Sequence, residues 1–282
     1  MNRAWHVYLR WMLDRRRSTI VWSLSIAAVS VITAAFYPSL RDAMSQGTES
    51  SAAMSSMLGF GEGIDPSSPV GFLWSFNYSN QLPWLLMALG IALGTASIAG
   101  DESEGTLEYL LAKPVTRTEV AFARFAGMVT VLVIASILNL VLVFVTAPLF
   151  ELGDDVTTTA PDGTTVTSPA VGFDDLFVGG FAAMAVGLGS GAVAYFLGAA
   201  TGRRGLALGV SSGFAVAGYV LYTLANVTGD FEPITWLSPW RWFMDDAMMV
   251  NGLTWDVLWP FVLALVALLA GWQLFLRRDL QK

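Results

Sequence analysis

Residues 125–150 read F-A-G-M-V-T-V-L-V-I-A-S-I-L-N-L-V-L-V-F-V-T-A-P-L-F and contain no charged residue. As a helix, such a run would be about 39 Å long at about 1.5 Å per residue, which exceeds the roughly 30 Å of a bilayer core. Residues 18–40 are also free of charge. Only 13% of the 282 residues are charged, about half the roughly 25% of a soluble domain. The sequence therefore predicts an all-α polytopic membrane protein.

Just before this run, residues 101–119 read D-E-S-E-G-T-L-E-Y-L-L-A-K-P-V-T-R-T-E and carry a dense cluster of charges. Residues 102–112 are mostly helix formers, and Pro114 would end a helix there. Three leucines of this segment would share one helical face. We predict a short amphipathic helix over 102–112, although eleven residues of periodicity also fit a solvated loop with ordinary caps.

The next helix has a recognisable start. Thr116 and Glu119 have the spacing of a capping box, in which the hydroxyl and the carboxylate each accept a backbone N–H bond. The helix is predicted to end near residue 147, ahead of Pro148. Because it is longer than the membrane core, we expect its first two turns to stand outside the hydrocarbon.

Hydrophobic runs predict six spans within a single domain of residues 1–282. The predicted spans are 19–37, 81–100, 119–147, 176–200, 205–225 and 255–276. Residues 1–17 alternate apolar and basic positions at helical spacing, which predicts a separate amphipathic helix in the membrane interface. The first span is expected to stop at Pro38.

Three polar segments separate the spans. Residues 41–69 predict a loop with a short helix around 50–58. Residues 151–175 place Pro-Asp-Gly between threonine runs, which fits either a small β-hairpin or an irregular loop. Residues 228–252 contain three tryptophans and two prolines, which is typical of re-entrant or interfacial helices at the outer surface.

The charges predict the orientation. Six spans place both termini on one side, and that side holds 13 of the 15 basic residues and 7 of the 22 acidic ones. Its net charge is 13 − 7 = +6, against 2 − 15 = −13 on the other side, which sum to the −7 of the whole chain. The positive-inside rule then makes both termini cytoplasmic.

Small residues recur every four positions on two predicted spans. They are Ala183, Gly187 and Gly191 on one, and Gly205, Gly209 and Gly213 on the next. This spacing lets helix backbones approach closely in lipid, either as static packing or as a moving interface. Asn139 is the most notable polar residue inside a span, and it either faces a transport pathway or bonds across helices.

The charged segment resembles the signature of type-2 ATP-binding-cassette (ABC) exporter permeases. The matching residues are Glu104, Gly105, Thr106, Leu107, Glu108, Leu110, Leu111, Pro114, Val115, Thr116 and Arg117. The layout agrees as well, with a large loop after the third span and a Ser-Pro-Trp segment before the sixth. The resemblance implies that this segment is a coupling helix that docks in a groove of a separate ABC ATPase subunit. It also implies a dimer of permeases with two ATPase subunits in the cell membrane.

We expect ATP and magnesium to bind the partner subunit and not this chain. The sequence has no Gly-x4-Gly-Lys-Ser/Thr loop, and neither lysine follows a glycine. It also lacks metal-ligand motifs and has no cysteine for thiol chemistry. No enzymatic activity, metal, cofactor or nucleic-acid partner is therefore expected, whereas membrane lipid is. The alternatives are a membrane anchor or assembly protein, and a secondary transporter, which would need intramembrane charges or broken helices.

Overall fold

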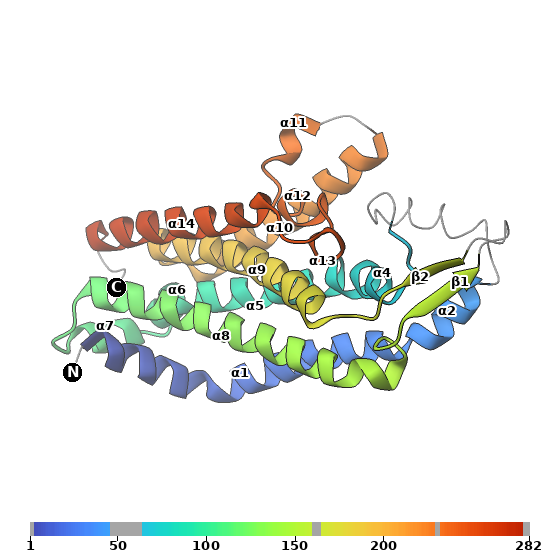
Figure 1. Ribbon diagram of the computed structural model, residues 1–282. Helices are drawn as coiled ribbons and strands as arrows, with labels where there is room; N and C mark the ends of the chain where they lie inside the picture. Colours follow the sequence, from blue (N-terminus) through green and yellow to red (C-terminus); the bar gives the residue numbers. More distant parts are fainter. Residues whose placement is uncertain (1–2, 46–63, 160–164, 229–231, 279–282) are drawn as a thin grey trace.

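Long helices dominate the computed structural model, which describes residues 3–45, 64–159, 165–228 and 232–278 (Figure 1). Within these residues, five helical segments are long and apolar enough to cross a membrane. They are built on α1 (Arg3–Ala35), α8 (Arg117–Thr146), α9 (Phe173–Thr201), α10 (Arg204–Thr228) and α14 (Leu258–Arg277). The predicted class of a helical multi-pass membrane protein is confirmed.

The predicted second span corresponds to α5 (Gln81–Ser97), which has 17 residues and is about 26 Å long. It is buried over most of its length and packs against α9. A Cβ atom added to Gly94 would lie 2.2 Å from the backbone oxygen of Gly191, so the two backbones touch. On α9, the predicted small-residue stripe is therefore a packed seam.

The stripe on α10 has a different environment. A Cβ atom placed on Gly205, Gly209 or Gly213 would meet no atom within 4 Å among the described parts of the chain. The same four-residue spacing thus accompanies contact on one helix and an open face on the next. The four-residue spacing permits close approach of another helix but does not determine which helix packs there.

The N-terminal segment differs from its prediction. The expected interfacial helix 1–17 and span 19–37 form one continuous 33-residue helix, α1. The segment between them contains neither glycine nor proline, so nothing interrupts the helix. Trp11 is buried against α8, where a Cβ atom on Gly127 would lie 2.5 Å from its ring. This packing fixes the first turns of α1 against a neighbouring helix.

Pro38 also has another role than the expected stop. Helix α1 ends at Ala35, and α2 (Tyr37–Ser45) begins immediately after a one-residue turn. Pro38 lies in the first turn of α2, where its missing N–H group costs no helical hydrogen bond. The predicted helix around 50–58 lies outside the described residues.

Short elements connect the long helices. Strands β1 (Val156–Thr159) and β2 (Thr165–Ser168) form an antiparallel hairpin, with Val156 opposite Ser168, so the hairpin interpretation is confirmed. Outside the charged segment 101–119, the short helices are α4 (Pro69–Leu73), π-helix η1 (Trp74–Tyr78), 3-10 helix η2 (Ala147–Phe150), α11 (Glu232–Thr235), α12 (Arg241–Met244), α13 (Met248–Asn251) and 3-10 helix η3 (Trp255–Val257). In the described part of the predicted aromatic segment, residues 232–252, short helices alternate with turns.

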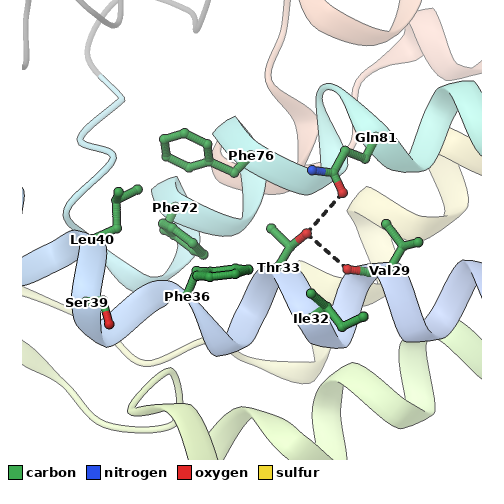
Figure 2. Close-up of a pocket in the computed structure, with 9 residues that line it drawn as sticks. All are labelled: Val29, Ile32, Thr33, Phe36, Ser39, Leu40, Phe72, Phe76 and Gln81. Carbon is green, nitrogen blue, oxygen red and sulfur yellow. Dashed lines mark hydrogen bonds between the residues drawn. The ribbon is translucent and has the colours of Figure 1, made fainter.

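The connections separate into two ends. The beginning of α1, the end of α14 and the short helix α7 (Thr106–Leu111) lie at one end of the molecule (Figure 1). The β-hairpin, α2 and α4 lie at the opposite end. Near that opposite end, a pocket lies between α1 and α2 on one side and α4, η1 and the start of α5 on the other (Figure 2).

Candidate coupling site at one end of the helix bundle

The charged segment folds as two short helices and not as the single helix predicted over 102–112. Helix α6 (Ala99–Ser103) is capped by Glu104, and α7 begins after Gly105. Gly105 has φ 69°, a left-handed conformation that residues with a Cβ atom adopt only at a cost. The Thr106 hydroxyl donates to the Asp101 carbonyl at 3.0 Å and bridges the break. The glycine of the motif therefore permits the break between α6 and α7.

Helix α7 has one face against the chain and one face in solvent. Leu107 is 1% exposed, whereas Tyr109 is 79% exposed. Leu110 and Leu111 are half-buried, and Glu108 is exposed. The leucines of the motif thus hold α7 on its own subunit. Tyr109 was not among the predicted site residues. Its position next to Glu108 on the polar face of the helix could have indicated an exposed aromatic side chain.

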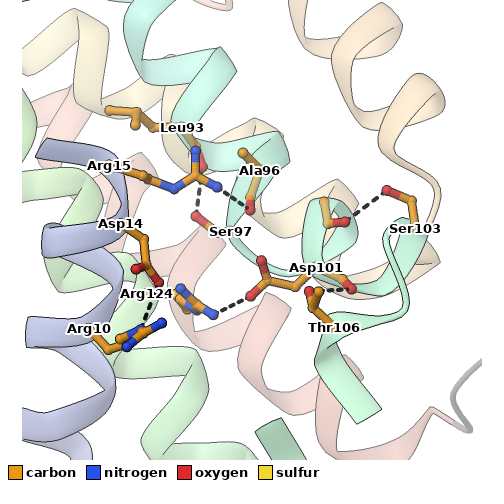
Figure 3. Close-up of polar contacts among 11 residues, drawn as sticks. Arg10, Asp14, Arg15, Leu93, Ala96, Ser97, Asp101, Ser103, Thr106 and Arg124 are labelled. Atoms are coloured by element: carbon orange, nitrogen blue, oxygen red, sulfur yellow. Dashed lines mark hydrogen bonds and ion pairs between the residues drawn. The ribbon is translucent and has the colours of Figure 1, made fainter. Parts of the chain in front are cut away.

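Two ion pairs hold α6 against neighbouring helices. Asp101 pairs with Arg124 of α8, and their side chains are only 14% and 12% exposed (Figure 3). Glu102 accepts two hydrogen bonds from the guanidinium of Arg278, at 3.1 and 2.5 Å, where α14 ends. Such charge-assisted, nearly desolvated contacts fix geometry strongly. Sequence reasoning missed both pairs, because their partners lie 23 and 176 residues apart.

Burial dominates the electrostatics of Asp101. Desolvation raises the pKa of its carboxyl group above the usual value, and the charges of Arg124 and Arg15 act in the opposite direction. Arg15 reaches from α1 and donates to the carbonyl of Ala96 at 3.2 Å. Charged residues of α1, α6 and α8 therefore meet around the end of α5, as Figure 3 shows.

The segment after α7 is fixed by backbone contacts. The Thr116 hydroxyl accepts from the Glu119 N–H at 3.1 Å, and the Glu119 carboxylate accepts from the Thr116 N–H at 2.8 Å, so the predicted capping box is confirmed. Arg117 donates to the carbonyls of Phe275 and Arg278, at 3.0 and 2.6 Å. The arginine of the motif thus caps α14, a favourable place for a cation at a helix C-terminus.

The outer rim of the site is more open. Glu104 pairs with Arg204 of α10 at 3.4 Å, and their side chains are 63% and 51% exposed. Arg3, in the first turn of α1, donates to the carbonyl of Pro114 at 2.9 Å. Residues 101–117, which we name the coupling segment after the function predicted for them, are therefore in direct contact with α1, α8, α10 and α14.

The remaining predicted residues lie elsewhere. Asn139 is buried in α8, and its amide nitrogen donates to the Tyr78 hydroxyl of η1 at 3.4 Å. This contact ties two elements together across the bundle. Gly205, Gly209 and Gly213 lie along α10 on its open face. Neither Asn139 nor this stripe contributes to the coupling segment.

Long apolar helices that meet a charged segment at one end define a multi-pass membrane protein. The chain belongs to the ABC-2 family of transporter proteins, whose family description matches residues 5–280. It is therefore a permease component of an ABC transporter, and the resemblance found in the sequence is confirmed. A comparison with curated proteins finds no match.

Proposed function

We propose that the chain is the permease subunit of an ABC exporter and that α7 is the coupling helix for a separate ATPase subunit. The observation that carries the proposal is Tyr109, 79% exposed on a helix whose Leu107 is 1% exposed. Exposed aromatic side chains are enriched at the centres of protein interfaces. A groove on an ATPase subunit would cover Tyr109 and its acidic neighbours Glu104 and Glu108.

The ion pairs support a route for the motion. A displacement of α7 would pull on α6, and through Asp101 and Glu102 on Arg124 and Arg278 at the ends of α8 and α14. Because these pairs are nearly desolvated, breaking them is costly, and the helices are expected to move with the segment. ATP-driven closure of two partner subunits would then alternate the access of the membrane pathway.

The arrangement that fits this role has six spans, α5 among them, with both termini in the cytoplasm of a cell whose plasma membrane holds the protein. ATP and magnesium bind the partner subunit, and this chain catalyses no reaction itself. A second copy of the permease completes the pathway. The open face of α10 at Gly205, Gly209 and Gly213 supports close helix packing with another copy.

Co-purification with candidate ATPase subunits, followed by ATP hydrolysis in liposomes, tests the proposal. Tyr109→Ala is expected to lower ATPase association by about tenfold or more, which corresponds to about 1.4 kcal/mol or more of binding energy. Trp255→Ala is the control, because Trp255 is 85% exposed and lies at the other end of α14 from the coupling segment.

If no ATPase subunit associates, or if both variants behave like the original chain, the proposal is wrong. Cargo movement without an ATPase would then favour a secondary transporter. The absence of any movement would favour a membrane anchor or assembly protein.

A further inference from the structure

The pocket of Figure 2 lies far from the coupling segment, and its size suits a ligand. Its volume is about 460 Å³, within the roughly 300–1,000 Å³ of typical ligand sites. Three phenylalanines line it, Phe36 from the one-residue turn between α1 and α2, and Phe72 and Phe76 from α4 and η1. Thr33 and Gln81 bring polar groups to the same space.

The mouth of the pocket continues the lipid-facing surface of α1. Ile32 and Phe36 at the mouth are 57% and 62% exposed. Ile20, Val21 and Leu24 extend the same exposed apolar surface along α1. In a bilayer this surface meets hydrocarbon, and an empty apolar cavity beside it would forfeit packing energy. Acyl chains of the bilayer are therefore expected to fill the pocket.

Thr33 and Gln81 lie at a depth in the bilayer that can be estimated from helix lengths. Thr33 is 16 residues beyond Arg17, the last basic residue before the charge-free run, which corresponds to about 24 Å along the helix. Gln81 opens α5 and lies about 26 Å from the other end of that helix. Both distances approach the roughly 30 Å thickness of the hydrocarbon core, so the pair is near its outer boundary. Lipid ester carbonyls occupy that boundary.

Gln81 offers hydrogen-bond donors at this boundary. The Thr33 hydroxyl is shared between the Val29 carbonyl and the Gln81 side-chain oxygen, each at 3.0 Å (Figure 2). With that oxygen engaged, the amide nitrogen of Gln81 presents N–H groups to the pocket. An amide facing hydrocarbon is costly unless an acceptor bonds to it, and an ester carbonyl is such an acceptor.

We propose that the pocket is a binding site for one phospholipid of the surrounding bilayer. One acyl chain packs against Phe36, Phe72 and Phe76, and its ester carbonyl accepts a hydrogen bond from Gln81. The site rests on the six-span arrangement of the proposed function, with α5 among the spans, and it does not depend on the ATPase partner.

Photolabelling in nanodiscs tests the site. The probe is phosphatidylcholine with a diazirine on the acyl carbons next to the ester, and labelled peptides are mapped by mass spectrometry. Labelling of residues 29–40 and 72–76 is expected to exceed that of the exposed α14 surface around Leu265 by about tenfold, equivalent to about 1.4 kcal/mol. Equal labelling of the two surfaces overturns the proposal.

Two variants sharpen the test. Ile32→Trp fills the mouth and is expected to abolish the excess labelling, whereas Leu265→Trp, at a residue of the same 57% exposure, leaves it intact.

Gln81→Leu keeps the cavity but removes the donor, so labelling by the probe next to the ester falls severalfold while a probe at the chain end still labels the pocket. Unchanged labelling in Ile32→Trp contradicts the site. If Ile32→Trp fails to fold, unchanged labelling in Gln81→Leu contradicts it instead. Labelling by a single-chain amphiphile but not by phosphatidylcholine would assign the pocket to cargo and also overturn the proposal.

Discussion

Asp101 and Glu104 belong to one run of acidic residues, yet their ion pairs lie in different environments. Asp101 pairs with Arg124 where both side chains are nearly desolvated, and Glu104 pairs with Arg204 where both are more than half exposed. Water screens the second pair and weakens it, whereas removing one partner of the first leaves a charge buried. One acidic cluster therefore contains a structural half, Asp101, whose ion pair is buried between helices, and a surface half, Glu104, whose ion pair is exposed to solvent.

The largest expected effect tests the structural half. Asp101→Asn preserves the shape of the side chain but leaves Arg124 buried without its counter-charge, so the free energy of unfolding is expected to fall by about 3–5 kcal/mol. Unfolding in nanodiscs, followed by circular dichroism, measures the loss. The double variant Asp101→Asn with Arg124→Met should recover much of it. A loss below about 1 kcal/mol, as for a surface pair, would contradict the distinction.

Leu107→Ala tests the buried face of α7. Leu107 is almost completely buried, and a Leu→Ala change in such a position costs about 2–5 kcal/mol. The same unfolding measurement applies, and Leu208→Ala on the exposed face of α10 is the control. Equal effects of the two variants would show that α7 does not rest on its leucine.

Glu104→Gln tests the surface half. The exposed pair with Arg204 is expected to contribute about 0–1 kcal/mol, and added salt should reduce even that contribution. Unfolding at low and high ionic strength measures it. A loss as large as that of Asp101→Asn would mean that the two pairs are equivalent.

Tyr109→Ala should have the smallest effect on stability and a large one on coupling. Substitution of an exposed side chain usually changes the free energy of unfolding by no more than about 0.5 kcal/mol. Its unfolding curve should therefore overlay that of the original chain while ATPase association falls. A variant that loses both properties together would place Tyr109 in the fold and not at the docking surface.

Much of the coupling segment could be predicted because its patterns are local. The capping box of Thr116 and Glu119 needs only four consecutive residues, and it forms as predicted. The break at Gly105 was missed, since glycine is tolerated inside a helix and its left-handed conformation depends on the contacts of α6. The side of α7 that faces solvent was equally undetermined, because leucines at helical spacing fit either a docking surface or a packed face.

The boundaries of the first span show the same limit. A proline ends a helix in its interior but is accommodated in a first turn, and Pro38 occurs in the first turn of α2. Helix α1 is continuous because no glycine or proline interrupts it between the two predicted segments. The contact of Trp11 with Gly127, which packs the first turns of α1 against α8, is not revealed by any pattern within residues 1–17.

Composition and hydrophobic run lengths were sufficient to predict a helical membrane protein, because the bilayer forces each spanning segment to satisfy its own backbone hydrogen bonds. The family was suggested by the motif within residues 104–117 and shown by the match over residues 5–280. The pairing of helices was not available from the same information. Equally spaced small residues lie in a packed seam on α9 and on an open face of α10. Asp101 finds Arg124 only after the helices assemble. Helix formation depends on neighbours along the chain, whereas burial and ion pairing depend on neighbours in space.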